Sequence, residues 1–377
     1  MHRSSDEDAS MRKFRTVGIR GAGLSGLSVA RALLAAHPEI SISVFDVRPK
    51  LPHPQRTFCF FKPQEIDIYN LPLHSWNRVT FRSSTFNRTL DVSSTPYTMV
   101  RGDDFFEHTL CELEASGVNF RWNCQEVSIG SNWIEADSVK EHFECAIDAA
   151  FCPSEVSSTM WQSFAGIWIS TDNPVFDPTT AILMDLQESS EDAPVSFFYI
   201  LPTSPHLALI EHTTFSPSPL SEQYHLKRCQ SWIHSQIKSQ FHIKGLERGI
   251  IPMGIVPTQQ RKSPLIIGSN GGFVRPATGY SFTTTLRDTT ALARTIIDGG
   301  SLQLCPYPPW LTFGDQIFLR ALRKDPLKGG HLLEQLLSRS PARALVSFLS
   351  GDVSLYEALS VWLSVPKISM VRSLLRT

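Results

Sequence analysis

The sequence predicts an α/β protein that combines a dinucleotide-binding domain with a mainly antiparallel β domain and a helical C-terminal region. Three observations support this fold class. Residues 16–46 follow the order strand, glycine-rich turn, helix and strand that is typical of a βαβ unit. Four strand-like runs between residues 164 and 213 are separated by proline-containing loops, as in an antiparallel sheet. Beyond residue 300, apolar residues recur at helical spacing.

The glycine-rich turn has the spacing G-x-G-x-x-G, formed by Gly21, Gly23 and Gly26. In dinucleotide-binding proteins the first glycine permits the tight turn, the second lets the backbone approach a pyrophosphate, and the third allows close packing of helix on strand. Unpaired N–H groups at the helix start and the helix dipole attract the phosphates. The alternative is a structural βαβ unit in which the glycines occur by chance.

The predicted site includes three further residues. Leu24 and Ser25 lie between the second and third glycines, and Asp46 ends the second strand 20 residues after Gly26. An acid at this place accepts hydrogen bonds from an adenosine ribose. Arg20 departs from the pattern, because the last strand position before the loop is usually apolar. Either the strand end is partly exposed, or Arg20 reaches a phosphate.

A second glycine-rich turn follows the buried run 265–268 and leads into a predicted helix over 281–298. Because no acid follows it, we expect it to fold back and complete the first site. A single site of this kind favours FAD over a free nicotinamide nucleotide. Its candidate cofactor-binding residues are Gly268, Gly271, Gly272, Pro276, Thr278 and Gly279.

These patterns divide the chain into three folded parts after a polar N-terminal tail, residues 1–13, which we expect to be disordered. The FAD-binding domain is predicted to be discontinuous, and the β domain is expected to bind the substrate. The boundaries are 14–60, 97–150 and 260–300 for the FAD-binding domain, 61–96 and 151–259 for the substrate domain, and 301–377 for the helical region.

Composition limits the classes of function. The 377 residues suggest about two domains. A net charge of −1 gives no argument for nucleic-acid binding. The seven cysteines are scattered without a C-x-x-C pair, so they predict no metal site and no disulfide framework, which fits a reducing cytoplasm.

The two ends of the chain bear on its location. The N-terminal tail lacks the apolar core of a signal peptide, and no run of about 18 apolar residues predicts a membrane span. Near the C-terminus, Lys367, Arg372 and Arg376 interrupt apolar residues. This pattern fits either a capping helical bundle or a helix that lies on a membrane surface.

Glu211 is the candidate catalytic residue, at the end of the apolar strand 207–210. An acid there is either a rim residue that accepts a hydrogen bond or, if it faces a pocket, a general acid whose pKa burial raises. Asp177 and Asp185 occupy similar positions. No nucleophile elbow and no H-E-x-x-H is present, so hydrolase and metalloprotease functions have no support. The aromatic run 58–61 is either a buried strand or a pocket wall.

Taken together and in order, these segments resemble the bacterial lycopene β-cyclase family of flavoproteins. The resemblance runs from about residue 15 to the end, and its order is more specific than any single motif. The matching segments are 21–26 (GAGLSG), 56–60 (RTFCF), 97–101 (YTMVR), 176–178 (FDP), 181–186 (AILMDL), 198–202 (FYILP), 208–211 (ALIE), 268–282 (GSNGGFVRPATGYSF), 319–326 (LRALRKDP) and 365–367 (VPK).

The resemblance implies a Rossmann-like, two-domain FAD-binding fold like that of the aromatic hydroxylases. It implies an isomerase that closes the ψ-ends of a linear carotene into β-ionone rings without net redox change, with FAD kept reduced by NAD(P)H. Glu211 matches the essential acid. The resemblance also implies a cytoplasmic protein at a membrane surface, with other carotenoid-pathway enzymes as possible partners. Further residues implied are Arg101 at the cofactor, and Phe58, Phe60 and Tyr280 at the substrate.

The chain departs from the family pattern at Ala150, where arginine is usual, and at Phe58 and Phe61, where tryptophans are common. Two other functions stay open. An FAD-dependent hydroxylase would usually carry Gly-Asp where this chain has Gly268-Ser-Asn. An inactive flavin-binding relative would be favoured if Glu211 pointed into the core, away from any flavin.

Overall fold

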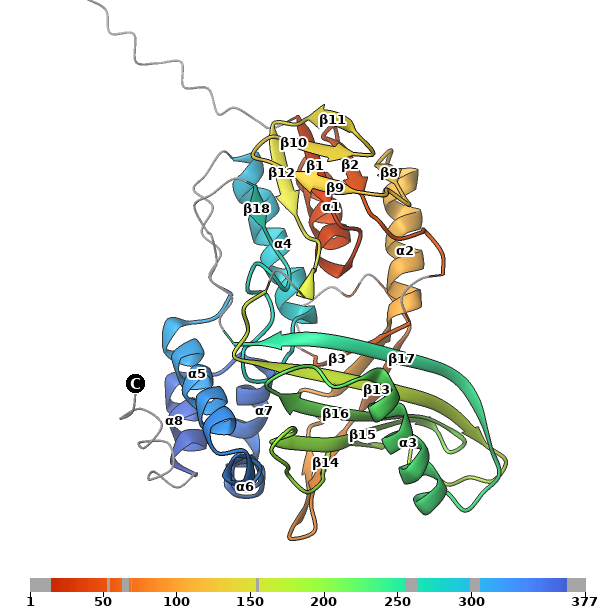
Figure 1. The fold of residues 1–377 in the computed structure, drawn as a ribbon, viewed down its shortest axis with the longest axis vertical. Coiled ribbons are helices and arrows are strands. Elements are labelled where there is room, and N and C mark those ends of the chain that lie inside the picture. Colours follow the sequence, from red (N-terminus) through yellow and green to blue (C-terminus); the bar gives the residue numbers. More distant parts are fainter. Residues whose placement is uncertain are drawn as a thin grey trace, which may run out of the picture.

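The computed structural model describes residues 15–52, 55–62, 68, 70–153, 156–254, 264–298 and 306–364. The predicted N-terminal tail, and Lys367, Arg372 and Arg376 near the other end, lie outside these described residues. The chain forms an upper α/β part and a lower part in which a long sheet lies beside a group of helices (Figure 1).

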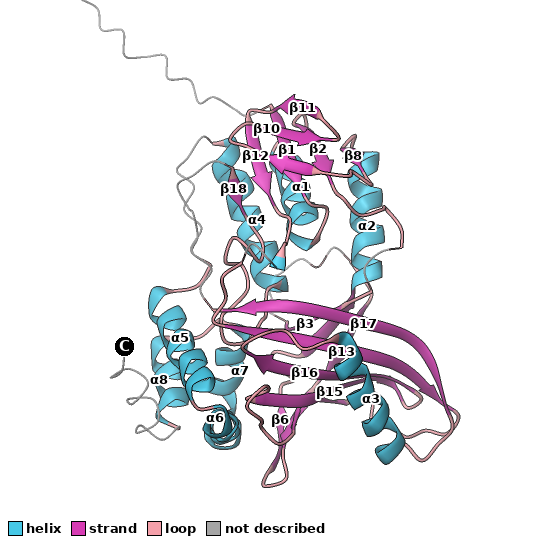
Figure 2. Ribbon diagram, viewed as in Figure 1, coloured by secondary structure: helices cyan, strands magenta, loops and turns pink. Residues whose placement is uncertain are grey.

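The upper part is built on a parallel sheet in the order β18-β12-β1-β2-β8. Its strands are short and their central positions are buried, as expected for a sheet covered by helices on its faces. Helices α1 and α4 pack against each other, and α2 packs against α1 (Figure 2). The bounds are β1 Thr16–Arg20, α1 Leu24–Ala36, β2 Ser41–Phe45, α2 Gly102–Ala115, β8 Asn119–Arg121, β12 Cys145–Asp148, β18 Leu265–Ile266 and α4 Phe282–Ile297.

Two small antiparallel sheets flank this part. One has the order β3-β7-β4 and carries the aromatic run 58–61 on its edge strand; the other has the order β11-β10-β9. Their strands are β3 Thr57–Phe61, β4 Leu73–Trp76, β7 Tyr97–Arg101, β9 Val127–Ile129, β10 Trp133–Ala136 and β11 Val139–His142.

The lower part contains a long sheet in the order β17-β13-β16-β15-β14-β5-β6. The four strands predicted for the β domain are all present, and the sheet has two further features. Residues 241–253 form a complete edge strand, and β14 pairs with β5 in parallel. The bounds are β5 Arg78–Arg82, β6 Asn87–Asp91, β13 Met160–Thr171, β14 Thr180–Leu186, β15 Val195–Ser204, β16 Leu207–Ser216 and β17 Phe241–Met253.

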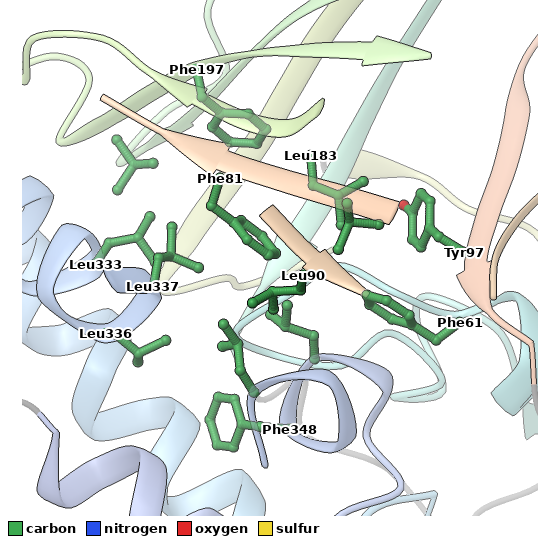
Figure 3. Close-up of a cluster of buried hydrophobic side chains, with 14 of the residues drawn as sticks. Phe61, Phe81, Leu90, Tyr97, Leu183, Phe197, Leu333, Leu336, Leu337 and Phe348 are labelled. Carbon is green, nitrogen blue, oxygen red and sulfur yellow. The ribbon is translucent and has the colours of Figure 1, made fainter. Parts of the chain in front are cut away.

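Helices cover both faces of the long sheet. Helix α3 (Glu222–Gln236) packs on one face through buried Cys229 and Ile233. On the other face, leucines of α6 contact phenylalanines of the strands (Figure 3). The C-terminal helices are α5 Pro309–Lys324, α6 Pro326–Arg339, α7 Ala342–Ser350 and α8 Leu355–Leu363.

A buried ion pair fixes this helical region to the second glycine-rich turn. Arg275 donates two hydrogen bonds of 3.1 Å to the carboxylate of Asp315 on α5, and both side chains are fully buried. Within the described residues, no single helix is long and apolar enough to cross a membrane; α7 and α8, bent by 114°, pass that test together on length and composition alone.

Candidate active site

A cavity of about 970 Å³ extends from the glycine-rich turn after β1 to the helices α5–α8. This volume is at the upper end of the roughly 300–1,000 Å³ typical of ligand pockets. Glycines and polar side chains line the end near the parallel sheet, whereas leucines and phenylalanines line the end near α6 and α7. The cavity therefore has a polar region and an apolar region.

The three motif glycines have the roles that their spacing predicts. Gly21 has φ of +99°, and a Cβ there would lie 2.8 Å from the backbone N of Ala150. A Cβ at Gly26 would overlap the carbonyl oxygen of Gly21, so this glycine permits close packing of helix on strand. At Gly23, by contrast, a Cβ would meet no atom within 4 Å. This open backbone at the start of α1 is the space that a pyrophosphate needs.

Two helices begin at the cavity. Gly23 is the N-cap of α1 and Ser281 is the N-cap of α4, and both residues line the cavity. Neither helix has a side chain that caps its first N–H groups. Each helix N-terminus carries a partial positive charge of roughly half an elementary charge. Together they make the polar region suited to an anionic ligand.

Asp46 lies at the end of β2 and is 5% exposed. One of its oxygens accepts a 2.7 Å hydrogen bond from the backbone N of Ala22, and Arg48 donates hydrogen bonds to both oxygens. Burial by itself would raise the pKa of Asp46, but the hydrogen bonds and charge of Arg48 outweigh burial and lower it. The carboxylate is thus held ionised at the cavity wall, where it accepts hydrogen bonds from the amide of Ala22 and from the amide and guanidinium of Arg48.

Arg20 has a structural explanation that the sequence did not provide. The register of β1 and β12 places Arg20 opposite Asp148, and their side chains form an ion pair of 3.2 Å. Arg20 also lines the cavity. The unusual arginine at the end of the first strand is therefore matched by an acid on the next strand.

The second glycine-rich turn folds back onto the first, as predicted. A Cβ at Gly268 would lie 2.8 Å from Ser25 Oγ. Asn270 donates a 3.1 Å hydrogen bond to the carbonyl oxygen of Ala150. Of the residues predicted to bind the cofactor, those that line the cavity are Gly21, Gly23, Leu24, Ser25, Asp46, Gly268, Thr278 and Gly279. Gly26, Gly271 and Gly272 instead shape the turns and their packing, and Pro276 is outside the cavity lining.

Two predicted site residues lie elsewhere. Arg101 forms an ion pair of 2.7 Å with Asp103 and lies over the ring of Trp168, outside the cavity lining. Phe60 is 3% exposed and stacks on Phe282 with ring centroids 4.9 Å apart, within the core of the upper part. Phe58 is two residues away on the same face of β3 and also stacks on Phe282, with ring centroids 5.0 Å apart. The aromatic run is therefore mainly a buried strand, of which Phe58 also lines the cavity.

Phe58 and Tyr280 do line the cavity, as predicted. Tyr280 belongs to a cluster of phenols that sequence analysis missed. Its hydroxyl lies 3.1 Å from that of Tyr97, which also forms a short hydrogen bond with Tyr199. Burial raises the pKa of all three tyrosines, so they stay neutral. They come from β7, β15 and the second glycine-rich turn, so no local motif could indicate the cluster.

Glu211 points into the cavity. It pairs with Tyr199 on β15 and with Gly166 on β13, while the adjacent His212 faces α3 and hydrogen-bonds His225. Glu211 is 7% exposed, and Thr213 donates a 2.8 Å hydrogen bond to it. Burial, followed by the negative charge of Glu247, raises the pKa of Glu211 well above its usual value. Glu211 is therefore an acid whose burial favours the protonated form, and it faces the cavity.

Glu247 is the second acid of the cavity and was not predicted. It is 5% exposed, lies on β17 and accepts a 2.6 Å hydrogen bond from Thr57 Oγ1. Burial raises its pKa, which the hydrogen bonds from Thr57, Glu211 and Trp168 partly offset. Residue 247 fell in a stretch for which the sequence gave no strand pattern. In the described part of the chain, no group of three or more metal-ligating side chains is assembled.

The apolar region of the cavity is a chamber between the long sheet and α6. Phe81, Leu183 and Phe197 line it from the sheet, and Leu333 and Leu337 line it from the helix (Figure 3). All five are at most 6% exposed. The chamber is therefore suited to an apolar ligand and is shielded from water.

Solved structures with this fold define the class of protein. A geranylgeranyl bacteriochlorophyll reductase-like protein from Thermoplasma acidophilum aligns with TM-score 0.60 and 14% identity, covering 96% of this chain and 98% of that chain. CtdE, solved in complex with FAD, aligns with TM-score 0.56 and 13% identity, covering 93% and 99%. The p-nitrophenol 4-monooxygenase PnpA from Pseudomonas putida DLL-E4 aligns with TM-score 0.54 and 12% identity, covering 96% of this chain and 97% of that chain. The predicted FAD-type flavoprotein fold is confirmed.

Within this class, the model of the lycopene cyclase protein family matches residues 17–375, so the chain belongs to the lycopene cyclase family. Lycopene beta-cyclase of Paracoccus sp. (strain N81106 / MBIC 01143) is 25% identical over 287 residues, which cover 70% of this chain and 69% of that protein. The chloroplastic lycopene beta cyclase of Arabidopsis thaliana is 24% identical, covering 77% and 62%. Neoxanthin synthase of Solanum lycopersicum is 27% identical over 151 residues, which cover 37% of this chain and 30% of that protein. The predicted family resemblance is confirmed.

Proposed function

We propose that this protein is a lycopene β-cyclase-like isomerase that closes the ψ-ends of a linear carotene into β-ionone rings. The observation that carries the proposal is a buried Glu211, with its pKa raised, that faces a cavity with a dinucleotide-type end and an apolar end. Membership of the lycopene cyclase family supports the same reaction. An acid-initiated cyclisation needs these three features together: a proton donor, a place for negative charge and a site without water.

The polar region fits FAD. Gly23 leaves its open backbone to the pyrophosphate, Asp46 is placed for the ribose, and the N-termini of α1 and α4 favour negative charge. When bound and reduced at the expense of NAD(P)H, FAD would supply a fixed negative charge beside the reacting polyene end. The α4 N-terminus would stabilise that charge, which supports the reduced anionic form.

The chemical steps follow from the residues of this chain. Glu211 donates its proton to the terminal double bond, ring closure moves the positive charge into the new ring, and loss of a ring proton ends the reaction. Buried donors and acceptors are effective here because the site excludes water. The neutral Tyr199, which pairs with Glu211 between β15 and β16 and lines the cavity, has an aromatic ring that would stabilise a nearby cation.

The apolar chamber would hold the polyene end, with Phe58 and Tyr280 between it and the cofactor region. We infer that one end of the substrate enters at a time, since the same cavity must also hold a flavin. Closure of both ends then requires the polyene to rebind with its other end in the cavity. The number of β-rings in the pigment products shows whether this happens.

A peripheral membrane contact accounts for delivery of so apolar a substrate. Leu355, Tyr356, Leu359 and Leu363 on α8 are exposed, whereas Trp362 of the same helix lines the cavity. An exposed apolar helix face of this kind inserts into the lipid interface. Cytoplasmic location at a membrane surface, and contacts with other carotenoid-pathway enzymes, remain predictions.

The membrane contact is tested by co-sedimentation with vesicles of phosphatidylcholine and phosphatidylglycerol. We expect Leu359→Glu with Leu363→Glu to reduce binding strongly, because both charges would enter the apolar interface. Val139→Glu is the matched control, since Val139 is also exposed but lies on β11, in the upper part of the molecule. Equal binding by the double variant and the control would contradict a contact through α8.

The cyclase function is tested by expressing the chain in a lycopene-accumulating bacterium and separating the pigments by chromatography. We expect lycopene to be replaced by products with one or two β-rings. Flavin absorbance of the purified protein checks that FAD is bound. Unchanged lycopene with FAD-loaded protein would refute the proposal, and NADPH-dependent oxygen uptake with an aromatic substrate would indicate a hydroxylase.

A further inference from the structure

Glu247 is a second carboxyl group beside Glu211 to which the proposed function gives no role. The strands β16 and β17 both pair with β13, and the register places Glu211 and Glu247 opposite the same residue, Gly166. A Cβ at Gly166 would lie 3.2 Å from Glu211 Cβ and 3.2 Å from Glu247 Cγ. The missing side chain at Gly166 therefore lets the two carboxyl groups meet across the middle strand, where they share a hydrogen bond.

The two acids differ in their other partners. Glu247 accepts hydrogen bonds from the hydroxyl of Thr57 and from the indole of Trp168, and Arg101 adds positive charge near it. Hydrogen-bond donors and nearby cations favour an ionised carboxylate. Glu211 has more protonated character, because the negative charge of Glu247 adds to the effect of its burial. Of the two acids, Glu211 therefore has the surroundings that favour the protonated form more.

We propose that Glu211 and Glu247 act as one proton-sharing pair, in which Glu211 is the acid of the cyclisation and Glu247 is the base that ends it. This inference rests on the proposed function and adds a second catalytic residue to it. Both carboxyl groups line the cavity, so both can reach a polyene end.

The proton balance is closed. The electrons of the terminal double bond form a C–H bond with the proton of Glu211, and the electrons of the next double bond form the ring C–C bond. The electrons of a ring C–H bond then form the ring double bond, and that proton passes to Glu247. It returns to Glu211 through their hydrogen bond, so each ring leaves the pair unchanged and consumes no oxidant or reductant.

Repulsion within the pair gives a physical reason for this division of roles. Once Glu211 has lost its proton, two carboxylates face each other across a glycine in a site without water, where like charges repel strongly. The pair is then a stronger base than an isolated carboxylate. Its negative charge also stabilises the carbocation until the ring proton is removed.

The other ionisable groups around the pair do not titrate near neutral pH. Burial raises the pKa of the thiols of Cys59 on β3 and Cys229 on α3, and of the phenol of Tyr199 on β15. The guanidinium groups of Arg56 and Arg101 stay charged. Among the groups of this chain, the two carboxyl groups are therefore the ones that a pH profile of the reaction reports.

The test compares the FAD-loaded wild-type protein with Glu247→Gln, with Thr57→Val and with Glu135→Gln, a control on β10 outside the cavity. The rate of ring formation from lycopene is measured against pH. Infrared spectra follow the band of the protonated carboxyl group, which does not depend on turnover. Flavin content and KM check that each variant is folded and binds its ligands.

We expect a bell-shaped profile for the wild type. Glu247→Gln should lower kcat about 100-fold, the lower end of the usual effect of a general base, with KM and flavin content retained. Its profile should lose the acidic limb, and its alkaline limb should move to lower pH because the charge that raises the pKa of Glu211 is gone. Thr57→Val should lower kcat about tenfold, since Glu247 loses a charge-assisted hydrogen bond.

The outcomes separate this inference from the proposed function. If the wild type forms rings and Glu247→Gln keeps the kcat and pH profile of the control, the pair is overturned and the cyclase function stands. If the wild type forms no rings, the cyclase function and the catalytic step of Glu247 are both overturned. The infrared measurement tests the proton-sharing pair even when no rings form. If the carboxyl band titrates at the same pH in the wild type and in Glu247→Gln, the pair itself is overturned.

Discussion

Buried acidic side chains have opposite pKa shifts at the two ends of the cavity. At the glycine-rich end, Asp46 is buried but ionised, because Arg48 and the amide of Ala22 bind it. At the long sheet, Glu211 is buried beside another acid, and burial raises its pKa. Similar burial thus accompanies a lowered pKa in one region and a raised pKa in the other, and the neighbouring groups decide which.

The largest expected effect comes from removing the proton donor. Glu211→Gln should reduce ring formation by about 1,000-fold or more, because the amide cannot protonate the double bond, while flavin binding is retained. Pigment chromatography and flavin absorbance measure the two quantities. Asp46→Asn should give the opposite pattern, with weaker flavin binding as the primary defect. Full activity of Glu211→Gln would remove Glu211 from the site.

The ion pair that joins the two regions gives the next largest effect. Asp315→Asn leaves the charge of Arg275 buried without its partner, which should cost about 3–5 kcal/mol of unfolding free energy. Urea denaturation measures this loss. Glu114→Gln removes one member of an exposed pair with Lys50 and should cost at most about 1 kcal/mol. Equal losses would mean that Arg275–Asp315 does not hold the C-terminal helices in place.

Within the glycine-rich end, two alanine substitutions should separate packing from binding. Gly26→Ala should lower the unfolding free energy by about 1–3 kcal/mol, because its Cβ would overlap the carbonyl oxygen of Gly21. Gly23→Ala should leave stability almost unchanged and weaken FAD binding, because its Cβ would enter open space. Thermal unfolding and flavin titration test this. Strong FAD binding by Gly23→Ala would contradict a pyrophosphate at Gly23.

The pH dependence of stability should show the smallest effect, with opposite signs at the two ends. The folded pKa of Glu211 lies above its usual 4.5, so the folded chain binds more protons and this contribution to stability falls as pH rises above that value. The folded pKa of Asp46 lies below its usual 3.8, so its contribution is complete above that value and is lost on acidification.

Urea unfolding of two variants across pH measures these signs. Relative to the wild type, Glu211→Gln should gain stability as pH rises from acid to neutral. Asp46→Asn should be destabilised at neutral pH, and this difference should shrink as pH falls. The same pH trend in both variants would contradict the contrast between an ionised and a protonated acid.

The sequence by itself determined the local features of this protein. Gly21, Gly23, Gly26 and Asp46 lie within one βαβ unit, and their roles depend on turns and contacts that nearby residues make. The order of motifs along the chain was enough to identify the flavoprotein fold and the lycopene cyclase family. Glu211 was one of several acids at apolar strand-like runs, and the family resemblance distinguished it as the candidate catalytic acid.

Only the tertiary structure decided how distant residues meet. Strand pairing brings Arg20 to Asp148, and Phe58 and Phe60 both stack on Phe282 of α4, far along the chain. Glu247 lies beside Glu211 because both strands pair with Gly166, a relation fixed by register across a sheet. Spacing along the chain contains no such information, since register depends on which strands become neighbours and which faces they bury.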